Sequence, residues 1–433
     1  MSGGFAKPGL TFAVILALHS GCFSTWVHGA SADGWPFIPG HVLQAEIEMK
    51  PEHWDALRKQ TRSKQQGPWG KGCFCDPVPT PFSYFPARLR LDGRVMENVA
   101  VRKKGMYGSL DDRRPSLKIN FSKFSKGRRL AGLKKLTLNN SKQDPSLVRQ
   151  CLGYELFRKA GVVAPRCGFV HLVVNGASLG VYVNVESIDK GFIKRHLGDG
   201  SLCLEEGAVS DLRPGWVRSF DRKFGSSQLC RHDLDSLVKL LLGPDALVER
   251  DLKKIIDLDS FFSFWAMESL LQDDDGYSFA ANNFFMAKGD DGLWRFIPWG
   301  IDEIMFQPTE PCEPFCQFVR TYSIMSLRLW LMPKMRREYL SRLKSIMHDL
   351  WDEDRLEARA GKMEEAIWPY LSRDQVRTMP EAMAKLVSFF CNRKKILIAE
   401  MQMGTGKVRP FLADPPCNPA SSLGKRDGKE PEY

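Results

Sequence analysis

The sequence predicts an α+β protein whose first half is rich in β-strands and whose second half is mainly helical. In the first half, short apolar segments alternate with turn residues, as they do in a series of hairpins. Beyond residue 230, the apolar residues change to helical spacing. A content of 43% hydrophobic and 26% charged residues is typical of a globular protein with a core, and it excludes disorder, collagen and a polytopic membrane protein as overall classes.

Two dipeptides organise the strands of the first half. Asp92-Gly93 and Asn175-Gly176 each lie between two apolar segments, and this pattern predicts a β-hairpin at each position. The predicted strands cover residues 85–91, 95–102, 117–121, 136–138, 169–174 and 181–185.

The helices are predicted from apolar spacing and from their end signals. Asp144-Pro145 predicts the start of the first helix, and Gly161 predicts its end. A short pair of strands, 283–286 and 294–297, interrupts the later helices. Residues 404–433, rich in Pro, Gly and charge, predict a flexible tail. The predicted helices cover residues 145–159, 251–271, 327–351, 355–371 and 380–401.

The N-terminus has the features of a secretory signal peptide, which we expect to comprise residues 1–32. Lys7 precedes an apolar run, residues 10–18, and Ala30-Ser31-Ala32 is a cleavage pattern. The alternative is an uncleaved anchor over residues 10–27. Cleavage would leave a secreted or extracytoplasmic protein with no stable membrane span.

The cysteine content agrees with an oxidising compartment. Of 11 cysteines, Cys22 would leave with the signal peptide, and ten would remain to form disulfides. We expect Cys151 to pair with Cys167, because the chain turns back between them. Zinc binding is the alternative, but the C-x-C at 73/75 and the C-x3-C at 312/316 lack a second matching motif.

The chain has 62 Lys and Arg against 51 Asp and Glu, a formal net charge of +11. This balance suits a nucleotide or another polyanion. No dense basic run is present, so nucleic acid is not an expected partner.

A basic turn and a strand lysine are candidates for binding phosphate. Residues 101–109 combine cations with two glycines, so Arg102, Lys104, Gly105 and Ser109 could meet an anion there. The alternative is a solvated hairpin end. Lys118 alternates with apolar neighbours on a predicted strand, where it could equally face solvent.

Three carboxylate-bearing segments complete the candidate chemistry. Glu186 ends the second hairpin, where it could pair with a Lys, hold an adenine-ribose edge or have no such role. Asp275, Asn283 and Asp302 follow in the order of a catalytic loop and a metal-binding carboxylate. Calcium binding and an ordinary solvated turn are the alternatives, although the spacing of an EF-hand is missing.

Several of these segments together resemble the CotH family of secreted, atypical kinases related to spore coat protein H. The resemblance extends from residue 101 to about residue 306 and becomes loose beyond it. It is carried by residues 101–105 with Ser109, 115–118, 136–140 with Asp144, 174–176, 180–182, Glu186, 275–277, 282–283 and 298–299.

The resemblance implies a two-lobed protein-kinase-like fold over residues 36–403, with an N-lobe at about 40–190 and a C-lobe at about 191–403. It implies ATP and Mg²⁺ as cofactors and transfer of the γ-phosphate to Ser or Thr of secreted or surface proteins. The implied roles are phosphate neutralisation by Lys118, nucleotide binding by Arg102, Lys104, Gly105, Ser109 and Glu186, acceptor positioning by Asp275, and magnesium binding by Asn283 and Asp302.

One position departs from the family pattern. Many members read Pro-Trp-Asp where this chain has Pro298-Trp299-Gly300. Asp302 lies two residues later, on the same face of an extended segment, and it would replace the missing carboxylate. A non-catalytic surface, coat or adhesion protein and an AMP transferase on the same fold are the alternative functions.

Overall fold

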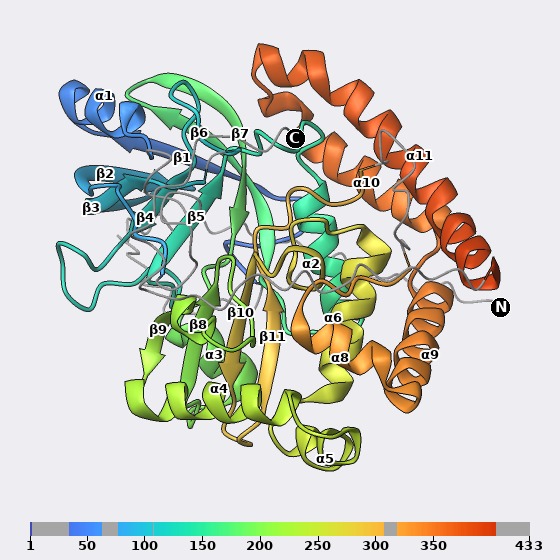
Figure 1. Ribbon diagram of the computed structural model, residues 1–433. Helices are drawn as coiled ribbons and strands as arrows, with labels where there is room; N and C mark the ends of the chain where they lie inside the picture. The colour runs from blue at the N-terminus through green and yellow to red at the C-terminus, as the bar shows by residue number, and fades with distance from the viewer. Residues whose placement is uncertain (2–33, 63–76, 107, 307–317, 404–433) are drawn as a thin grey trace, which may run out of the picture.

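The computed structural model describes Met1 and residues 34–62, 77–106, 108–306 and 318–403. The expected signal peptide, the expected tail and the C-x-C and C-x3-C motifs lie outside these residues. The α+β prediction is confirmed, because strands dominate the first half and helices the second (Figure 1).

The first half forms a closed barrel of seven strands in the order β1-β2-β3-β4-β5-β7-β6. The barrel closes through parallel pairing of β1 with β6, and α1 (Pro51–Lys59) follows β1. Both predicted hairpins are present, with Asp92 and Asn175 in the left-handed conformation. The strands are β1 (Val42–Glu48), β2 (Phe85–Leu91), β3 (Arg94–Lys103), β4 (Leu117–Asn120), β5 (Lys135–Asn139), β6 (Cys167–Val174) and β7 (Ala177–Val185).

The predicted strand pair 283–286 and 294–297 is not isolated. It is part of a four-stranded sheet in the order β11-β10-β8-β9. The sequence analysis missed three strands, β1 of the barrel and β8 and β9 of this sheet. β8 and β9 are short and rich in charge, so they lack an apolar alternation. The strands are β8 (Cys203–Gly207), β9 (Asp221–Gly225), β10 (Phe284–Lys288) and β11 (Trp294–Pro298).

The helices begin and end somewhat differently from the predictions. The first begins at Arg149 rather than residue 145, because Leu147 has a left-handed φ of 64°. The helix predicted over 251–271 begins at Leu258 after Asp257 caps it, and the helix predicted over 327–351 divides before Pro333. The helices are α2 (Arg149–Lys159), α3 (Lys190–Leu197), α4 (Ser227–Leu241), α5 (Asp245–Asp251), α6 (Leu258–Leu271), α7 (Tyr277–Ala280), α8 (Ile324–Leu331), α9 (Pro333–Asp349), α10 (Glu353–Ile367) and α11 (Arg373–Met403).

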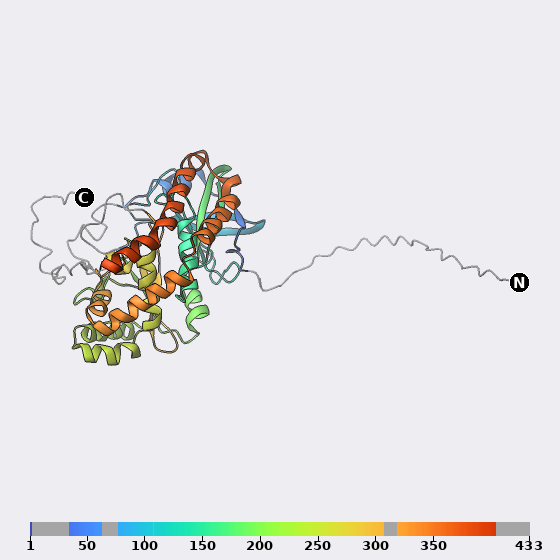
Figure 2. The same cartoon turned by 90° about the vertical axis from the view of Figure 1, so that its right-hand side faces the viewer.

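The long helix α11 contacts both the barrel and the helical core. Helices α10 and α11 lie at the right of Figure 1, and Figure 2 shows that side turned toward the viewer. Near its start, the Gln375 amide accepts from the Val181 N–H at 3.0 Å and donates to the Val181 carbonyl at 2.8 Å. About five turns later, Arg393 donates to the Leu270 carbonyl at 3.0 Å and to Gln272 Oε1 at 3.3 Å. One helix therefore joins β7 to the end of α6.

The expected Cys151–Cys167 disulfide is confirmed, with the two Cα atoms 5.0 Å apart. A second disulfide, Cys203–Cys230, joins β8 to α4. The expectation that all remaining cysteines are oxidised is wrong for Cys391, which is an exposed free thiol on α11. Within the described residues, no helix is long and apolar enough to span a membrane.

Replacing both Cys151 and Cys167 with Ser should lower the free energy of unfolding by about 3 kcal/mol, because the bridge closes a loop of 16 residues in the unfolded chain. Urea unfolding measures the effect. Cys391→Ser, which breaks no bridge, is the control. Equal stability of the double variant and the control would contradict the prediction, as would recovery of Cys151 and Cys167 as free thiols in peptide mapping.

Candidate functional site

A cleft of about 800 Å³ lies between the barrel and the four-stranded sheet. This volume is within the range of small-molecule and cofactor sites. Of the nine predicted site residues, all but Glu186 line it: Arg102, Lys104, Gly105, Ser109, Lys118, Asp275, Asn283 and Asp302.

The barrel side of the cleft is basic. Arg102 on β3 is the register partner of Lys118 on β4, so both side chains point to the cleft face while Leu117 and Ile119 lie in the barrel core. Burial lowers the pKa of Lys118 to about 7, and the neighbouring cation Lys135 adds to the effect. Burial also lowers the pKa of Lys104, against the attraction of the Asp302 carboxylate. Burial leaves these lysines incompletely hydrated, so an anionic ligand would stabilise their charged form.

Gly105 and Ser109 form the turn that follows Lys104. Gly105 has φ 130°, and a Cβ there would lie 2.8 Å from Ser109 Oγ, so only glycine fits without displacing the serine. Ser109 Oγ accepts the N–H of Met106 at 3.2 Å. The turn is thereby fixed at the edge of the cleft.

Asp275 lies opposite, in the loop between α6 and α7. Its carboxylate accepts from Asn282 Nδ2 at 2.9 Å and from Asn283 Nδ2 at 2.5 Å. Burial raises its pKa, while these two amides oppose the shift. The predicted neighbours Asn283 and Asp275 are therefore in direct contact.

The two aspartates that precede Asp275, Asp273 and Asp274, lie in different environments. Asp274 has 45% side-chain exposure and pairs with Arg320 at 2.7 Å. Asp273 is only 3% exposed, and burial, with the nearby Glu268 carboxylate second, raises its pKa well above the usual range. A carboxyl in this place favours the protonated form.

Glu268 is a positioning residue that the sequence analysis missed. Its two carboxylate oxygens accept the N–H groups of Tyr277 and Ser278 at 2.8 and 2.9 Å, and it is 1% exposed. Gly276 makes this approach possible, because a Cβ there would lie 2.5 Å from Glu268 Oε1. The available signal was an acidic residue in the second half of α6, where most of its neighbours are apolar.

Asp302, just after β11, is 7% exposed. Burial raises its pKa to about 6, and Lys104 and a hydrogen bond from Asn139 oppose the rise. Lys104 and Asn139 therefore compensate its negative charge in part. The segment that follows Asp302 packs closely against α2. A Cβ on Gly153 of α2 would lie only 2.4 Å from the Ile304 side chain.

The donors in the cleft suit Mg²⁺. Asp275 and Asp302 offer carboxylate oxygens and Asn283 offers an amide oxygen, the hard ligands that Mg²⁺ prefers. Mg²⁺ in phosphoryl-transfer sites takes few protein ligands and completes its shell with phosphate and water. Among the described residues, no group of three or more His, Cys, Asp or Glu side chains is placed to hold a metal ion, so magnesium binding stays a prediction.

Gly300, the departure from the family pattern, packs against Asn283. It has φ 59°, and a Cβ there would lie 2.9 Å from Asn283 Oδ1. A side chain at this position would both strain the backbone and displace Asn283.

Gly300→Ala should therefore lower Mg²⁺-dependent phosphate transfer, the activity that the family resemblance implies, by about 10-fold, because it displaces Asn283, the predicted metal ligand. Gly292→Ala is a matched control, because Gly292 has φ 80° with no atom within 4 Å of the added Cβ. Both changes strain the backbone, and Gly300→Ala should cost more stability in thermal unfolding because its Cβ also meets Asn283. Equal activity of the two variants would show that the position of Asn283 is unimportant.

Glu186 does not line the cleft. Its carboxylate pairs with Arg166 at 2.7 Å and with Arg195, and these two cations hold the pKa of the buried group below its usual range against the effect of burial. The expected contact with an adenine-ribose edge has no support in this arrangement.

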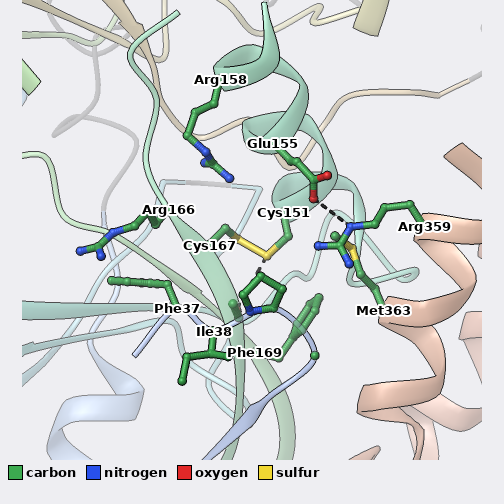
Figure 3. Close-up of a pocket in the computed structure, with 13 residues that line it drawn as sticks. Phe37, Ile38, Cys151, Glu155, Arg158, Arg166, Cys167, Phe169, Arg359 and Met363 are labelled. Atoms are coloured by element: carbon green, nitrogen blue, oxygen red, sulfur yellow. Dashed lines mark hydrogen bonds and ion pairs between the residues drawn. A yellow bond between two sulfur atoms is a disulfide. The ribbon is translucent and has the colours of Figure 1, made fainter. Parts of the chain in front are cut away.

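A second cavity, of about 260 Å³, lies beside the Cys151–Cys167 disulfide (Figure 3). Arg359 on α10 reaches across it to Glu155 on α2 at 2.9 Å, and Arg166 is already paired with Glu186. The charges around this cavity mainly compensate one another, so it is a weaker candidate than the cleft.

The fold and the cleft define an α+β protein with a polar site whose walls carry opposite charges. The family described as CotH kinase protein matches residues 101–395, and the chain belongs to the CotH family.

Two curated relatives come from Bacillus subtilis (strain 168). The chain is 25% identical over 312 residues to inner spore coat protein H, covering 69% of this chain and 82% of the relative. It is 26% identical over 227 residues to an inner spore coat protein H-like protein, covering 52% of this chain and 66% of that relative.

Proposed function

We propose that the protein is a secreted, Mg²⁺-dependent kinase that transfers the γ-phosphate of ATP to Ser or Thr of secreted or surface proteins. One observation carries the proposal: a single cleft holds the cations Arg102, Lys104 and Lys118 opposite the carboxylates Asp275 and Asp302. Phosphoryl transfer needs this combination of phosphate neutralisation, metal binding and an acceptor-side carboxylate. In this proposal the barrel and the four-stranded sheet belong to two kinase-like lobes, and ATP binds between them.

The residues have separable roles in this reaction. Lys104, Lys118 and Arg102 hold the phosphates, and the aromatic side chains of Phe285 and Trp299, which also line the cleft, are suited to contact the base. Asn283 and Asp302 would hold Mg²⁺, which neutralises charge on the phosphates when bound.

Asp275 positions the acceptor hydroxyl and receives its proton. The hydroxyl oxygen forms a bond to the γ-phosphorus while the bond from that phosphorus to the bridging oxygen breaks, and ADP leaves. The raised pKa of Asp275 supports this role, since burial makes the carboxylate a better base than an exposed aspartate.

The proposed location and partners have independent support. The two disulfides are typical of an oxidising compartment, and the relatives are spore coat proteins by name. We infer that the acceptor is a secreted, coat or surface protein.

The test compares transfer of label from γ-labelled and α-labelled ATP to protein acceptors, with and without Mg²⁺. Incorporation from the γ-position alone supports the kinase. Incorporation from the α-position would indicate AMP transfer, and no incorporation with any Ser- or Thr-containing acceptor would favour a non-catalytic coat or adhesion protein.

ATP binding at pH 8 should take up about one proton, because Lys118 with a pKa near 7 is mostly neutral in the free protein and becomes charged beside phosphate. Calorimetry in buffers of different ionisation enthalpy measures the uptake. Lys118→Met should abolish it, whereas Lys344→Met, on the distant α9, should not. Equal uptake by both variants would contradict the role of Lys118.

A further inference from the structure

The cleft continues into a basic surface that the proposed nucleotide site does not use. We call it the β4–β5 rim, because most of its residues lie in the connection between these strands, which projects at the left of Figure 1 above β9. The rim consists of Lys123, Lys126, Arg128, Arg129, Lys134, Lys135 and Lys190.

The rim is continuous with the cleft. Four of its members, Arg129, Lys134, Lys135 and Lys190, line the same cavity as Lys118 and Asp275. Lys135 is close enough to Lys118 to help lower the pKa of that lysine. A ligand in the cleft can therefore extend directly onto the rim.

The rim cations have no acidic partners of their own. Across the described parts of the chain, none of the seven forms a salt bridge, although Lys194 and Arg195 on the adjacent α3 do. Arg128 and Arg129 donate to backbone carbonyls, those of Glu97 and Gly132. Asp189, the residue before α3, also lines the cleft, and its side chain caps that helix by accepting the N–H groups of Gly191 and Phe192.

Uncompensated like charges on one surface repel each other and lower stability, and they attract an oppositely charged partner. Mg²⁺ and the cations Arg102, Lys104 and Lys118 already balance much of the negative charge of ATP. The rim charge is additional to what the nucleotide needs, and it borders the place where an acceptor must enter.

We propose that the β4–β5 rim binds an acidic segment of the protein acceptor, adjacent to the Ser or Thr that is phosphorylated. This inference rests on the proposed kinase function for its substrate, and on the unpaired cations for its chemistry. Charge complementarity of this kind raises the association rate and discriminates against basic partners.

The binding test uses two labelled synthetic peptides, each with one serine, flanked in one by aspartates and in the other by lysines. Fluorescence anisotropy should show that the acidic peptide binds the wild-type protein and that about 0.5 M salt weakens it, since salt screens exposed charges. Lys126→Glu/Lys134→Glu, two exposed rim positions, should weaken binding by about 10-fold or more.

The matched control is Lys344→Glu/Lys362→Glu, the same charge reversal at exposed positions of α9 and α10. It should bind the acidic peptide like the wild type. Equal affinities of the rim and control variants, or tighter binding of the lysine peptide, would overturn the proposal. Tighter, rim-dependent binding of a single-stranded oligonucleotide would overturn it as well, in favour of a nucleic-acid surface.

Failure of the rim and failure of the kinase give different results. If the acidic peptide binds at the rim but receives no phosphate with ATP and Mg²⁺, the kinase proposal fails and the docking surface remains. If acidic and lysine peptides are phosphorylated with the same kcat/KM, the kinase stands and the rim proposal fails.

Discussion

Asp302→Asn is expected to reduce Mg²⁺-dependent phosphate transfer by about 10³-fold while the protein stays folded. Asp302 is the buried carboxylate after Gly300, and Lys104 faces it across the cleft. The change removes the charge with little change of volume. Since burial destabilises the ionised form, the variant should unfold at the same temperature or slightly higher.

The measurement compares turnover at increasing Mg²⁺ with thermal unfolding of the same samples. Asp290→Asn, in the β10–β11 turn, is the control, because Asp290 lies outside the residues that line the cleft. Full Mg²⁺-dependent activity of Asp302→Asn would show that the metal assignment is wrong.

The same carboxylate predicts a pH dependence. Its folded pKa of about 6 is above the usual 3.8, so the folded state binds the proton more tightly than the unfolded state. The stabilisation from this proton is complete below pH 3.8 and is lost as the pH rises through about 6. Mg²⁺ competes with the proton, so metal affinity in the free protein should fall as the pH drops below about 6.

Asp275→Asn should have the second large effect. We expect it to lower turnover by about 10²-fold or more and to change nucleotide affinity little. The substitution removes the basic carboxylate. It also places an amide donor opposite Asn282 and Asn283, whose own amides donate to Asp275 in the wild-type protein. Single-turnover kinetics and equilibrium nucleotide binding separate the effect on turnover from the effect on affinity.

Asp274→Asn is the control for Asp275, since Asp274 is exposed at the protein surface beside Arg320. Asp273 is unsuitable as a control, because it is buried against Glu268 and its replacement would disturb the loop. An inactive Asp274→Asn with an active Asp275→Asn would place the catalytic carboxylate one residue earlier. Full activity of both would favour the non-catalytic alternative.

Local sequence signals predicted much of the fold. Asp92-Gly93 and Asn175-Gly176 give hairpins because these residues adopt left-handed conformations at little cost, whatever surrounds them. The family resemblance also grouped Lys118, Asp275 and Asp302 in one predicted site, and the three residues line one cleft. Hydrophobic periodicity alone could not have grouped residues so far apart in the sequence.

The errors came from contacts that a linear pattern does not contain. β8 and β9 exist because β10 offers them a hydrogen-bonding edge, and their own charged sequences do not indicate strands. Glu186 pairs with two arginines, one of them on the following helix α3, and its local sequence indicates neither contact. Asp273 lies against Glu268, a residue of the preceding helix, and its burial could not be inferred from its acidic neighbours.

The attachments of α11 have a consequence for movement. Gln375 is fixed to Val181 in the barrel, and Arg393 is fixed to the residues just before Asp273. The segment between these two anchors spans about 27 Å of one helix, at about 1.5 Å per residue. Any movement that separates the barrel from the end of α6 would therefore require α11 to detach from one of its two anchors or to bend at Pro380, which lies inside the helix between them.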